Sequence, residues 1–204
     1  KLTANLLVKS GVDRVLAMDL HSAQTQGYFD IPCDHIYGSP VLVDYLSAQD
    51  LGEVVVVSPD VGGVARARAF AKQMNGAPLA IIDKRRTGHN MAESLTVIGD
   101  VSGRTAILID DMIDTGGTIC SGAKLLREQG ATSVIACATH PVFSPPAIER
   151  LSVEGLFEQV VVTNSIPIAS NHAFPQLHVL SVANMLGEAI WRIHEESSVS
   201  SMFR

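Results

Sequence analysis

The chain has 204 residues, enough for one or two domains of ordinary size. With 47% hydrophobic and 18% charged residues, its composition is that of a folded globular protein and excludes a disordered chain. The net charge of −6 argues against binding nucleic acid through bulk charge, and no apolar run approaches the ~20 residues of a membrane span. The three cysteines are too few and too scattered for a disulfide framework or a four-ligand zinc site, which favours a reducing, cytoplasmic location.

The first predicted element is a short amphipathic helix that ends near Gly11, with Leu2 and Leu6 on one face. Its apolar part is too short for a signal peptide, and no small-residue cleavage site follows it. Because the chain starts with Lys1 and inside a helix, we expect that its natural beginning is missing.

After this helix, short β-branched runs alternate with helical patterns. The expected strands are 14–19, 53–58, 79–83, 105–109, 134–139, 159–163 and 177–180, and the expected helices are 40–49, 64–74, 117–129, 146–151 and 182–194. Strands such as 53–58 are apolar on both faces, which is typical of buried parallel strands. The alternation predicts an α/β fold with a parallel sheet, in which ligands bind outside the carboxyl ends of the strands.

The strongest candidate site follows the expected strand 105–109 and includes Asp110, Asp111 and the segment Asp114-Thr115-Gly116-Gly117-Thr118. Three carboxylates within five residues repel one another, so a fold keeps them together only where hydroxyls or cations are bound. The Thr-Gly-Gly-Thr run opens a predicted helix, whose N–H groups and hydroxyls form an anion site of the size of one phosphate. An acidic turn with one helix cap would explain one such residue, but not three carboxylates and two glycines. We therefore predict a sugar-phosphate site, with a diol on Asp110 and Asp111.

Acidic residues at two further strand ends are candidates for a cation site. Asp60 precedes two glycines and can hold Mg²⁺ directly or through water, although a plain strand-to-helix turn also needs a glycine. Asp19 and His21 point to the same side of a strand tip, and Asp30 and Asp34 follow closely enough to join them. A lone histidine is more often structural than a ligand, so this second group depends on the other motifs.

Basic residues follow two of the expected strands. Lys84, Arg85 and Arg86 leave the same sheet edge as the phosphate loop. Three adjacent cations usually belong to a solvated loop, but here they also fit a mobile loop that closes over a polyphosphate. Arg66 and Arg68, in the helix after Asp60, are interpreted partly as surface charges. The chain has no Walker A, G-x-G-x-x-G, H-E-x-x-H or G-x-S-x-G sequence, so any nucleotide is bound in another way.

Residues 109–118 resemble the phosphoribosyl diphosphate binding signature of type I phosphoribosyltransferase folds. With further matching segments, essentially the whole chain resembles the ribose-phosphate diphosphokinase family; these segments are 18–21, 26–32, 57–63, 83–86, 162–165 and 198–200. The resemblance implies that ATP and ribose 5-phosphate give phosphoribosyl diphosphate and AMP, with Mg²⁺. It also implies a homo-oligomer, commonly a hexamer, with no nucleic-acid or membrane partner.

The resemblance also implies roles for individual residues. The catalytic cations are Lys84 and Arg86, of which Arg86 also contacts ribose 5-phosphate. The other ribose 5-phosphate residues are Asp110, Asp111, Asp114, Thr115, Gly116, Gly117 and Thr118. The Mg²⁺ ligands are His21 and Asp60, with Asp19 near the first and Asp30 and Asp34 as weaker candidates. The residues Ser198, Ser200 and Phe203 match a C-terminal stretch associated with a regulatory site.

Family members have two similar α/β halves, and most of the first half, with its Arg-Gln-Asp-type segment for adenine and phosphate, is absent here. Residues 1–37 resemble the end of the first domain, 38–178 the complete second domain, and 179–204 a segment that returns to the first. Without its partner, we expect Leu186, Ile190 and Trp191 of the last helix to be exposed, and this chain alone to be inactive.

Two alternative functions remain open. A phosphoribosyltransferase shares the 110–118 motif but does not need the matches at 19–21 and 58–63. A non-catalytic subunit that binds synthetase subunits is expected to carry damage in the catalytic loop, where Lys84 and Arg86 are in place.

Overall fold

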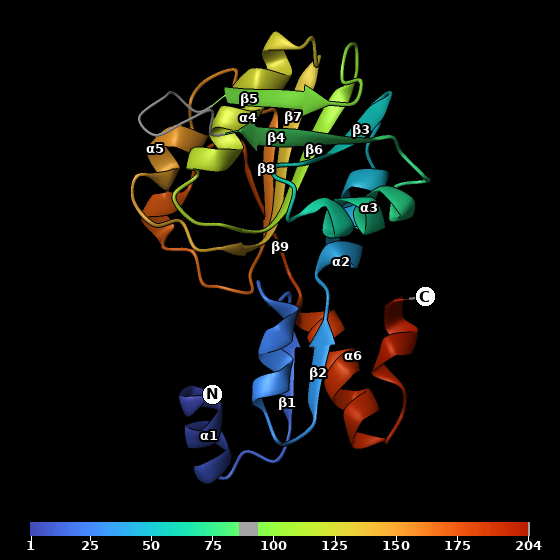
Figure 1. The fold of residues 1–204 in the computed structure, drawn as a ribbon, viewed down its shortest axis with the longest axis vertical. Coiled ribbons are helices and arrows are strands. Elements are labelled where there is room, and N and C mark those ends of the chain that lie inside the picture. The colour runs from blue at the N-terminus through green and yellow to red at the C-terminus, as the bar shows by residue number, and fades with distance from the viewer. Residues whose placement is uncertain (86–93, 204) are drawn as a thin grey trace.

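The computed structural model describes residues 1–85 and 94–203, which form two β-sheets with helices around them (Figure 1). The larger sheet has seven strands, in the spatial order β5 (Ser94–Ile98), β4 (Leu79–Arg85), β3 (Val54–Ser58), β6 (Thr105–Ile113), β7 (Ser133–Pro141), β8 (Gln159–Thr163) and β9 (Leu177–Leu180). The pair β4 and β5 is antiparallel, and the other neighbouring strands are parallel. The predicted α/β fold with a parallel sheet is confirmed, except that the edge strand β5 runs antiparallel to β4.

Helices cover both faces of the larger sheet. On one face lie α2 (Ser39–Ser47) and α3 (Val64–Gln73), and on the other α4 (Gly117–Glu128) and α5 (Ala147–Leu151). Alternate residues of β3 pack on opposite faces of the sheet: Val55 and Val57 pack with α4, and Val56 packs with α3. Both faces of the strand are therefore buried, which is why its sequence is continuously apolar.

The smaller sheet consists of two parallel strands, β1 (Val15–Met18) and β2 (Cys33–Ile36). Around it lie α1 (Leu2–Lys9), α6 (Ala183–His194) and two 3₁₀ segments, η1 (Ala23–Tyr28) and η3 (Val199–Phe203); a third, η2 (Ser170–His172), lies between β8 and β9 in the chain. Both chain ends belong to this part of the molecule, below the larger sheet in Figure 1. Ile36, Ala189 and Val199 form its buried apolar cluster, and Ala4 on α1 is also buried.

The main differences from the predicted elements are longer strands at the functional edge. β6 continues to Ile113, because Asp110 pairs with Ala138 and Met112 with His140 on β7. β4 continues to Arg85, because Lys84 pairs with Leu95 on β5. These polar residues are thus on strands and not after them. Strands β2 and β5 have no counterpart among the predicted elements, since their short, polar-interrupted sequences give little periodic signal.

The exposure of the terminal helices agrees only in part with expectation. Ile190 and Trp191 are 59% and 56% exposed, as expected, whereas Leu186 packs against the smaller core, so its expected exposure is wrong. Leu2 and Leu6, on the apolar face of α1, are 75% and 62% exposed. Among the helices that the structure describes, none has the length and apolar character that crossing a membrane requires.

Candidate functional site

An acidic pair on β6 forms the centre of the candidate site. Arg66, from the first turns of α3, donates from Nη1 to Asp110 Oδ1 at 2.9 Å and lies 3.2 Å from Asp111 Oδ1 through Nη2. His21, from the turn after β1, places Nδ1 2.9 Å from the other oxygen of Asp111. The Asp111 side chain is only 1% exposed. One guanidinium therefore bridges the two carboxylates, while an imidazole contacts the more buried one.

The two carboxyl groups of this pair have different acidities. Burial and the hydrogen bond with Asp111 raise the pKa of Asp110 from 3.8 to about 7. Burial acts in the same direction on Asp111, but the hydrogen bond from Asp110, the charge of Arg66 and the contact with His21 together hold the pKa of Asp111 below its usual range. Near neutral pH, Asp110 can thus donate or accept a hydrogen bond, whereas Asp111 accepts.

The segment 114–118 lies directly after β6 and leads into α4. Gly116 is the residue before the helix and has φ +72°, a left-handed conformation that glycine adopts without strain. In the described structure, no side chain caps this helix, and Asp114, Thr115 and Thr118 are exposed. Backbone N–H groups at the start of a helix carry partial positive charge and attract anions. The loop and helix start thus combine hydroxyls and N–H groups next to the acidic pair.

Two arginines belong to this edge of the sheet although the sequence patterns did not single them out. The sequence interpretation of Arg66 as partly a surface charge is incomplete, because its side chain is 28% exposed and contacts both carboxylates. Its place two residues after the start of α3, close to the Asp60 turn, is the one feature of the sequence that indicates a role in the site. Arg150, on α5, donates from Nη1 to the Thr115 carbonyl at 3.0 Å and so brings a cation to the 114–118 loop. No sequence motif marks this second residue.

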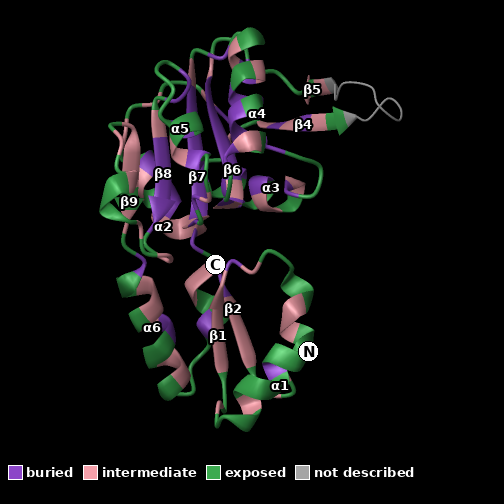
Figure 2. Ribbon diagram, turned by 90° about the vertical axis from the view of Figure 1, so that its left-hand side faces the viewer, coloured by how far each residue is buried: buried purple, intermediate pink, exposed green. Residues whose placement is uncertain are grey.

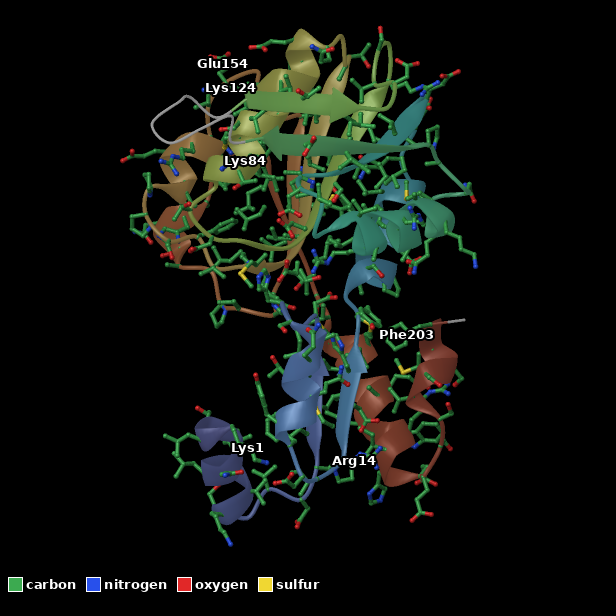
Figure 3. All side chains as sticks on the ribbon, in the orientation of Figure 1. Lys1, Arg14, Lys84, Lys124, Glu154 and Phe203 are labelled. Carbon is green, nitrogen blue, oxygen red and sulfur yellow. The ribbon has the colours of Figure 1, made fainter. Side chains whose placement is uncertain are left out.

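Asp60 and Lys84 lie at the ends of β3 and β4. Asp60 is exposed, and its Oδ1 accepts a hydrogen bond from Gly63 N at 2.8 Å, as in an ordinary turn. Lys84 is exposed on β4, and Figure 3 shows it on the part of the molecule that contains the larger sheet. Arg86 lies outside the residues that the structure describes.

The remaining acidic candidates are not gathered around His21. The Asp19 side chain is buried, and its Oδ2 accepts hydrogen bonds from Gly38 N and Thr139 Oγ1 at 2.7 and 2.5 Å. Asp30 pairs with Lys1, and Asp34 pairs with Arg14. Figure 3 shows Lys1 and Arg14 toward the end of the smaller part that is farther from the larger sheet. Within 1–85 and 94–203, no three His, Cys, Asp or Glu residues form a group that could hold a metal.

A cavity of about 500 Å³ opens beside the acidic pair and is lined from both parts of the molecule. Its lining includes His21, Arg66 and Asp110, together with the aromatic residues Tyr37 and Phe203. The rings of Tyr37 and Phe203 meet edge to face, with centroids 5.8 Å apart. Of the three regulatory candidates, Phe203 thus lines the cavity, while the hydroxyls of Ser198 and Ser200 are 3.0 Å from each other.

Comparison with known proteins places these features in a family. Residues 87–204 match the model of the phosphoribosyl synthetase-associated domain. Ribose-phosphate pyrophosphokinases from Parasynechococcus marenigrum and Synechococcus elongatus are 89% and 74% identical over all 204 residues, and the chain covers 62% of each. The crystal structure of phosphoribosylpyrophosphate synthetase from Mycobacterium smegmatis superposes with a TM-score of 0.88 at 46% identity, covering 96% of this chain and 63% of that one. The chain spans about 62% of the length of these curated relatives, and it belongs to the phosphoribosyl synthetase-associated domain family.

Proposed function

We propose that the natural protein containing this chain is a ribose-phosphate diphosphokinase. It transfers the diphosphoryl group of ATP to the 1-hydroxyl of ribose 5-phosphate, giving 5-phosphoribosyl 1-diphosphate and AMP for nucleotide biosynthesis. The observation that carries this proposal is the acidic pair of Asp110 and Asp111 directly beside the 114–118 loop at the start of α4. The names of the relatives, at up to 89% identity over the whole chain, support the same activity.

The acidic pair and the loop divide the recognition of ribose 5-phosphate between them. The carboxyl group of Asp110, which is 26% exposed, forms hydrogen bonds with the ribose hydroxyls, and the 114–118 loop receives the 5-phosphate. Asp111 is 1% exposed and its oxygens already contact Arg66 and His21, so it supports the site from beneath and does not contact the sugar. Arg150, which donates to the Thr115 carbonyl, adds positive charge beside this loop. An acidic centre next to an anion site fits a molecule with hydroxyls at one end and a phosphate at the other.

Diphosphoryl transfer depends mainly on alignment and on neutralisation of charge. The 1-hydroxyl attacks the β-phosphorus of ATP, the bond from that phosphorus to the bridging oxygen of the α-phosphate breaks, AMP leaves and the hydroxyl proton passes to solvent. In this scheme Lys84 and Arg86 neutralise charge that develops on the transferred group, and Asp110 and the 114–118 loop hold the sugar in line. The scheme needs no dedicated general base.

The residues of the site fit Mg²⁺ that is held largely by substrate phosphates. Mg²⁺ keeps several waters and usually takes one or two protein oxygens in addition to phosphate oxygens. Asp60 supplies an exposed carboxylate and His21 an exposed ring, so His21 and Asp60 are the residues proposed to hold it. When bound, the ion offsets the negative charge of the polyphosphate. Asp19 is not proposed as a ligand of the ion, because its Oδ2 already accepts two hydrogen bonds. Asp30 and Asp34 are not proposed as ligands either, because they pair with Lys1 and Arg14.

The organisation of the natural protein is also proposed from these features. Residues 1–37 end one α/β domain, 38–178 form a second, and 179–204 return to the first, as the packing of α6 residues on β2 supports. The cavity beside Arg66 and Asp110 is the proposed entry for ATP, with Phe203 as the regulatory candidate that lines it. We propose a cytoplasmic homo-oligomer; the free thiols of Cys33, Cys120 and Cys137 support a reducing location.

The proposal is tested by assaying AMP release by the full-length natural protein with ATP, Mg²⁺ and ribose 5-phosphate. AMP must form only when the sugar phosphate is present, in equal amount to phosphoribosyl diphosphate. Methyl riboside 5-phosphate, whose 1-hydroxyl is blocked, is the matched control and must give no AMP. Release of diphosphate from phosphoribosyl diphosphate and a nucleobase would instead identify a phosphoribosyltransferase, and no turnover with either set would identify a non-catalytic subunit.

A further inference from the structure

The carboxyl ends of β1 and β7 meet at a buried hydrogen-bonded junction between the two sheets. The Asp19 carboxylate is the link, because one of its oxygens accepts from the Thr139 hydroxyl at 2.5 Å and from Gly38 N at 2.7 Å. Asp19 and Thr139 are 8% and 3% exposed. A hydrogen bond to a charged group at a buried position is stronger than one between neutral groups in water, so this junction is a firm connection.

His140, the next residue on β7, makes a second connection to the same turn. Its Nε2 lies 3.0 Å from the Met18 carbonyl and 3.1 Å from the Asp19 carbonyl. Because both partners are acceptors, Nε2 must carry the proton. Nδ1 lies 2.9 Å from Ser165 Oγ on the far side of the ring, which fixes the ring orientation. The backbone of β1 is thus held directly where it ends.

The junction has a constrained geometry. Asp19 has φ +39°, a left-handed conformation that costs energy in a residue with a side chain and persists only where the surroundings enforce it. A Cβ atom on Gly38 would lie 2.7 Å from Thr139 Oγ1 and 3.2 Å from Asp19 Oδ2, so this approach requires glycine. The following amide, Leu20 N, donates to His35 Nε2 at 3.0 Å. We call Asp19, Gly38, Thr139 and His140 the Asp19 latch.

The consequence of the latch is the position of His21. Two residues after Asp19, this ring reaches across 90 positions of sequence to contact Asp111 at 2.9 Å, although its own side chain is 75% exposed. An exposed side chain has no packing of its own to hold it, so its position follows from the backbone turn beneath it. We propose that Thr139 and His140 are positioning residues, which hold the turn 19–21 so that His21 stays against Asp111. The catalytic consequence rests on the proposed function, whereas the structural one does not.

The structural consequence is tested by hydrogen exchange in the full-length protein without substrates. In Thr139→Val, which keeps the side-chain shape and removes the hydroxyl, the amides of residues 19–21 should exchange about tenfold faster. The amides of β6 should be unchanged, and Thr139→Ser, which restores a hydroxyl, should return the parent rates. The control is Thr105→Val, since this buried threonine donates to the Leu51 carbonyl at 2.9 Å at the opposite end of β6.

The catalytic consequence is tested by a double-mutant cycle with His21→Ala, measured as kcat/KM of the diphosphokinase reaction. Thr139→Val should lower kcat/KM about tenfold in the parent and have almost no further effect in His21→Ala, because it acts through that ring. Thr105→Val should leave kcat/KM unchanged. If the double variant lost kcat/KM by the product of the two single losses, the Thr139 hydroxyl would act through general stability and not through His21. That result would overturn the proposal.

A second variant keeps the test decisive where Thr139→Val does not fold. His140→Leu removes the contacts with the Met18 and Asp19 carbonyls, and it should speed exchange at 19–21 in the same way. Parent rates at 19–21 in every folded latch variant would overturn the latch. Faster exchange at 19–21 in a protein whose parent has no diphosphokinase activity would uphold the latch and refute the proposed function instead.

Discussion

The two sheets of this chain differ in how much of their surface is covered. Of the residues of β1 and β2, all of which are described, only Ile36 is buried, whereas β8 is buried over most of its length. Figure 2 shows the same contrast, with purple concentrated in β6, β7 and β8 and with pink and green prevailing in the smaller part. A two-stranded sheet is marginal by itself and needs further packing. The larger sheet is therefore the rigid element, and the smaller one depends on additional contacts.

The candidate site uses both kinds of region. The acidic pair and the 114–118 loop belong to the rigid sheet, where pairing with β7 holds Asp110 extended. His21 comes from the less covered part and reaches the site through the Asp19 latch. Exposed apolar side chains on the terminal helices, such as Leu6 and Trp191, lie in this less covered part. We infer that the larger sheet sets the positions of Asp110 and the 114–118 loop, whereas the position of His21 depends on the contacts that join the smaller part to the larger sheet.

The largest expected effect is on the core of the larger sheet. Phe70 is fully buried on α3, and Phe70→Ala should lower the free energy of unfolding by about 3–5 kcal/mol, because it leaves a cavity that its neighbours cannot fill. Chemical denaturation of the full-length protein measures this loss. A change below about 1 kcal/mol would contradict the view that this sheet is the rigid part.

The next largest effect concerns catalysis at the edge of the larger sheet. Under the proposed function, Lys84→Ala in the full-length protein should lower kcat by about 10²–10³-fold with a smaller effect on the KM for ribose 5-phosphate, because the proposal needs the charge of Lys84 mainly during transfer. Steady-state kinetics over a range of both substrates measures this separation. Lys124→Ala, on α4, is the control for loss of a surface lysine, and an unchanged kcat in Lys84→Ala would remove Lys84 from the mechanism.

A moderate loss of stability is expected when the bridge between the two carboxylates is removed. Arg66→Met should lower the free energy of unfolding by about 1–3 kcal/mol at neutral pH, since it leaves the buried Asp111 without this donor. Arg68→Met, at an exposed position of the same helix, should stay within about 0.5 kcal/mol of the parent. Equal effects of the two variants would mean that the Arg66 bridge contributes nothing.

The pH dependence of stability should report the raised pKa of Asp110. Between its ordinary value of 3.8 and about 7, the folded protein keeps a proton that the unfolded chain has released. The contribution of this group to the free energy of unfolding therefore falls as pH rises from about 4 to about 7. Asp110→Asn should flatten this part of the profile, which denaturation at several pH values measures. An identical slope in parent and variant would show that another group titrates there.

The smallest effect is expected in the less covered part. Ile190→Ser, at a position that is 59% exposed on α6, should change the unfolding free energy of the 204-residue chain by less than about 0.5 kcal/mol. In the full-length protein the same variant should cost more, if the additional length of the relatives covers this helix. Equal costs in both would mean that the helix face stays exposed.

Strong local patterns made the central part of this protein predictable. The continuously apolar runs of β3, β6 and β8 require burial on both faces, and so they indicate a parallel sheet without any knowledge of their neighbours. The Thr-Gly-Gly-Thr segment likewise carries its own geometry, because glycine supplies the left-handed turn at Gly116 and the helix start supplies the N–H groups. In both cases a few adjacent residues contain the whole physical requirement.

Contacts between distant segments could not be predicted in this way. Arg66 is an ordinary polar residue of a helix until the sheet brings two carboxylates to it, and Asp19 resembles a cation ligand until Thr139 and Gly38 take up its oxygen. The strand at 33–36 exists because β1 offers it a partner, not because its own residues favour it. Local sequence specifies the elements and the 114–118 loop, whereas the partners of each polar side chain depend on packing between residues as far as 133 positions apart.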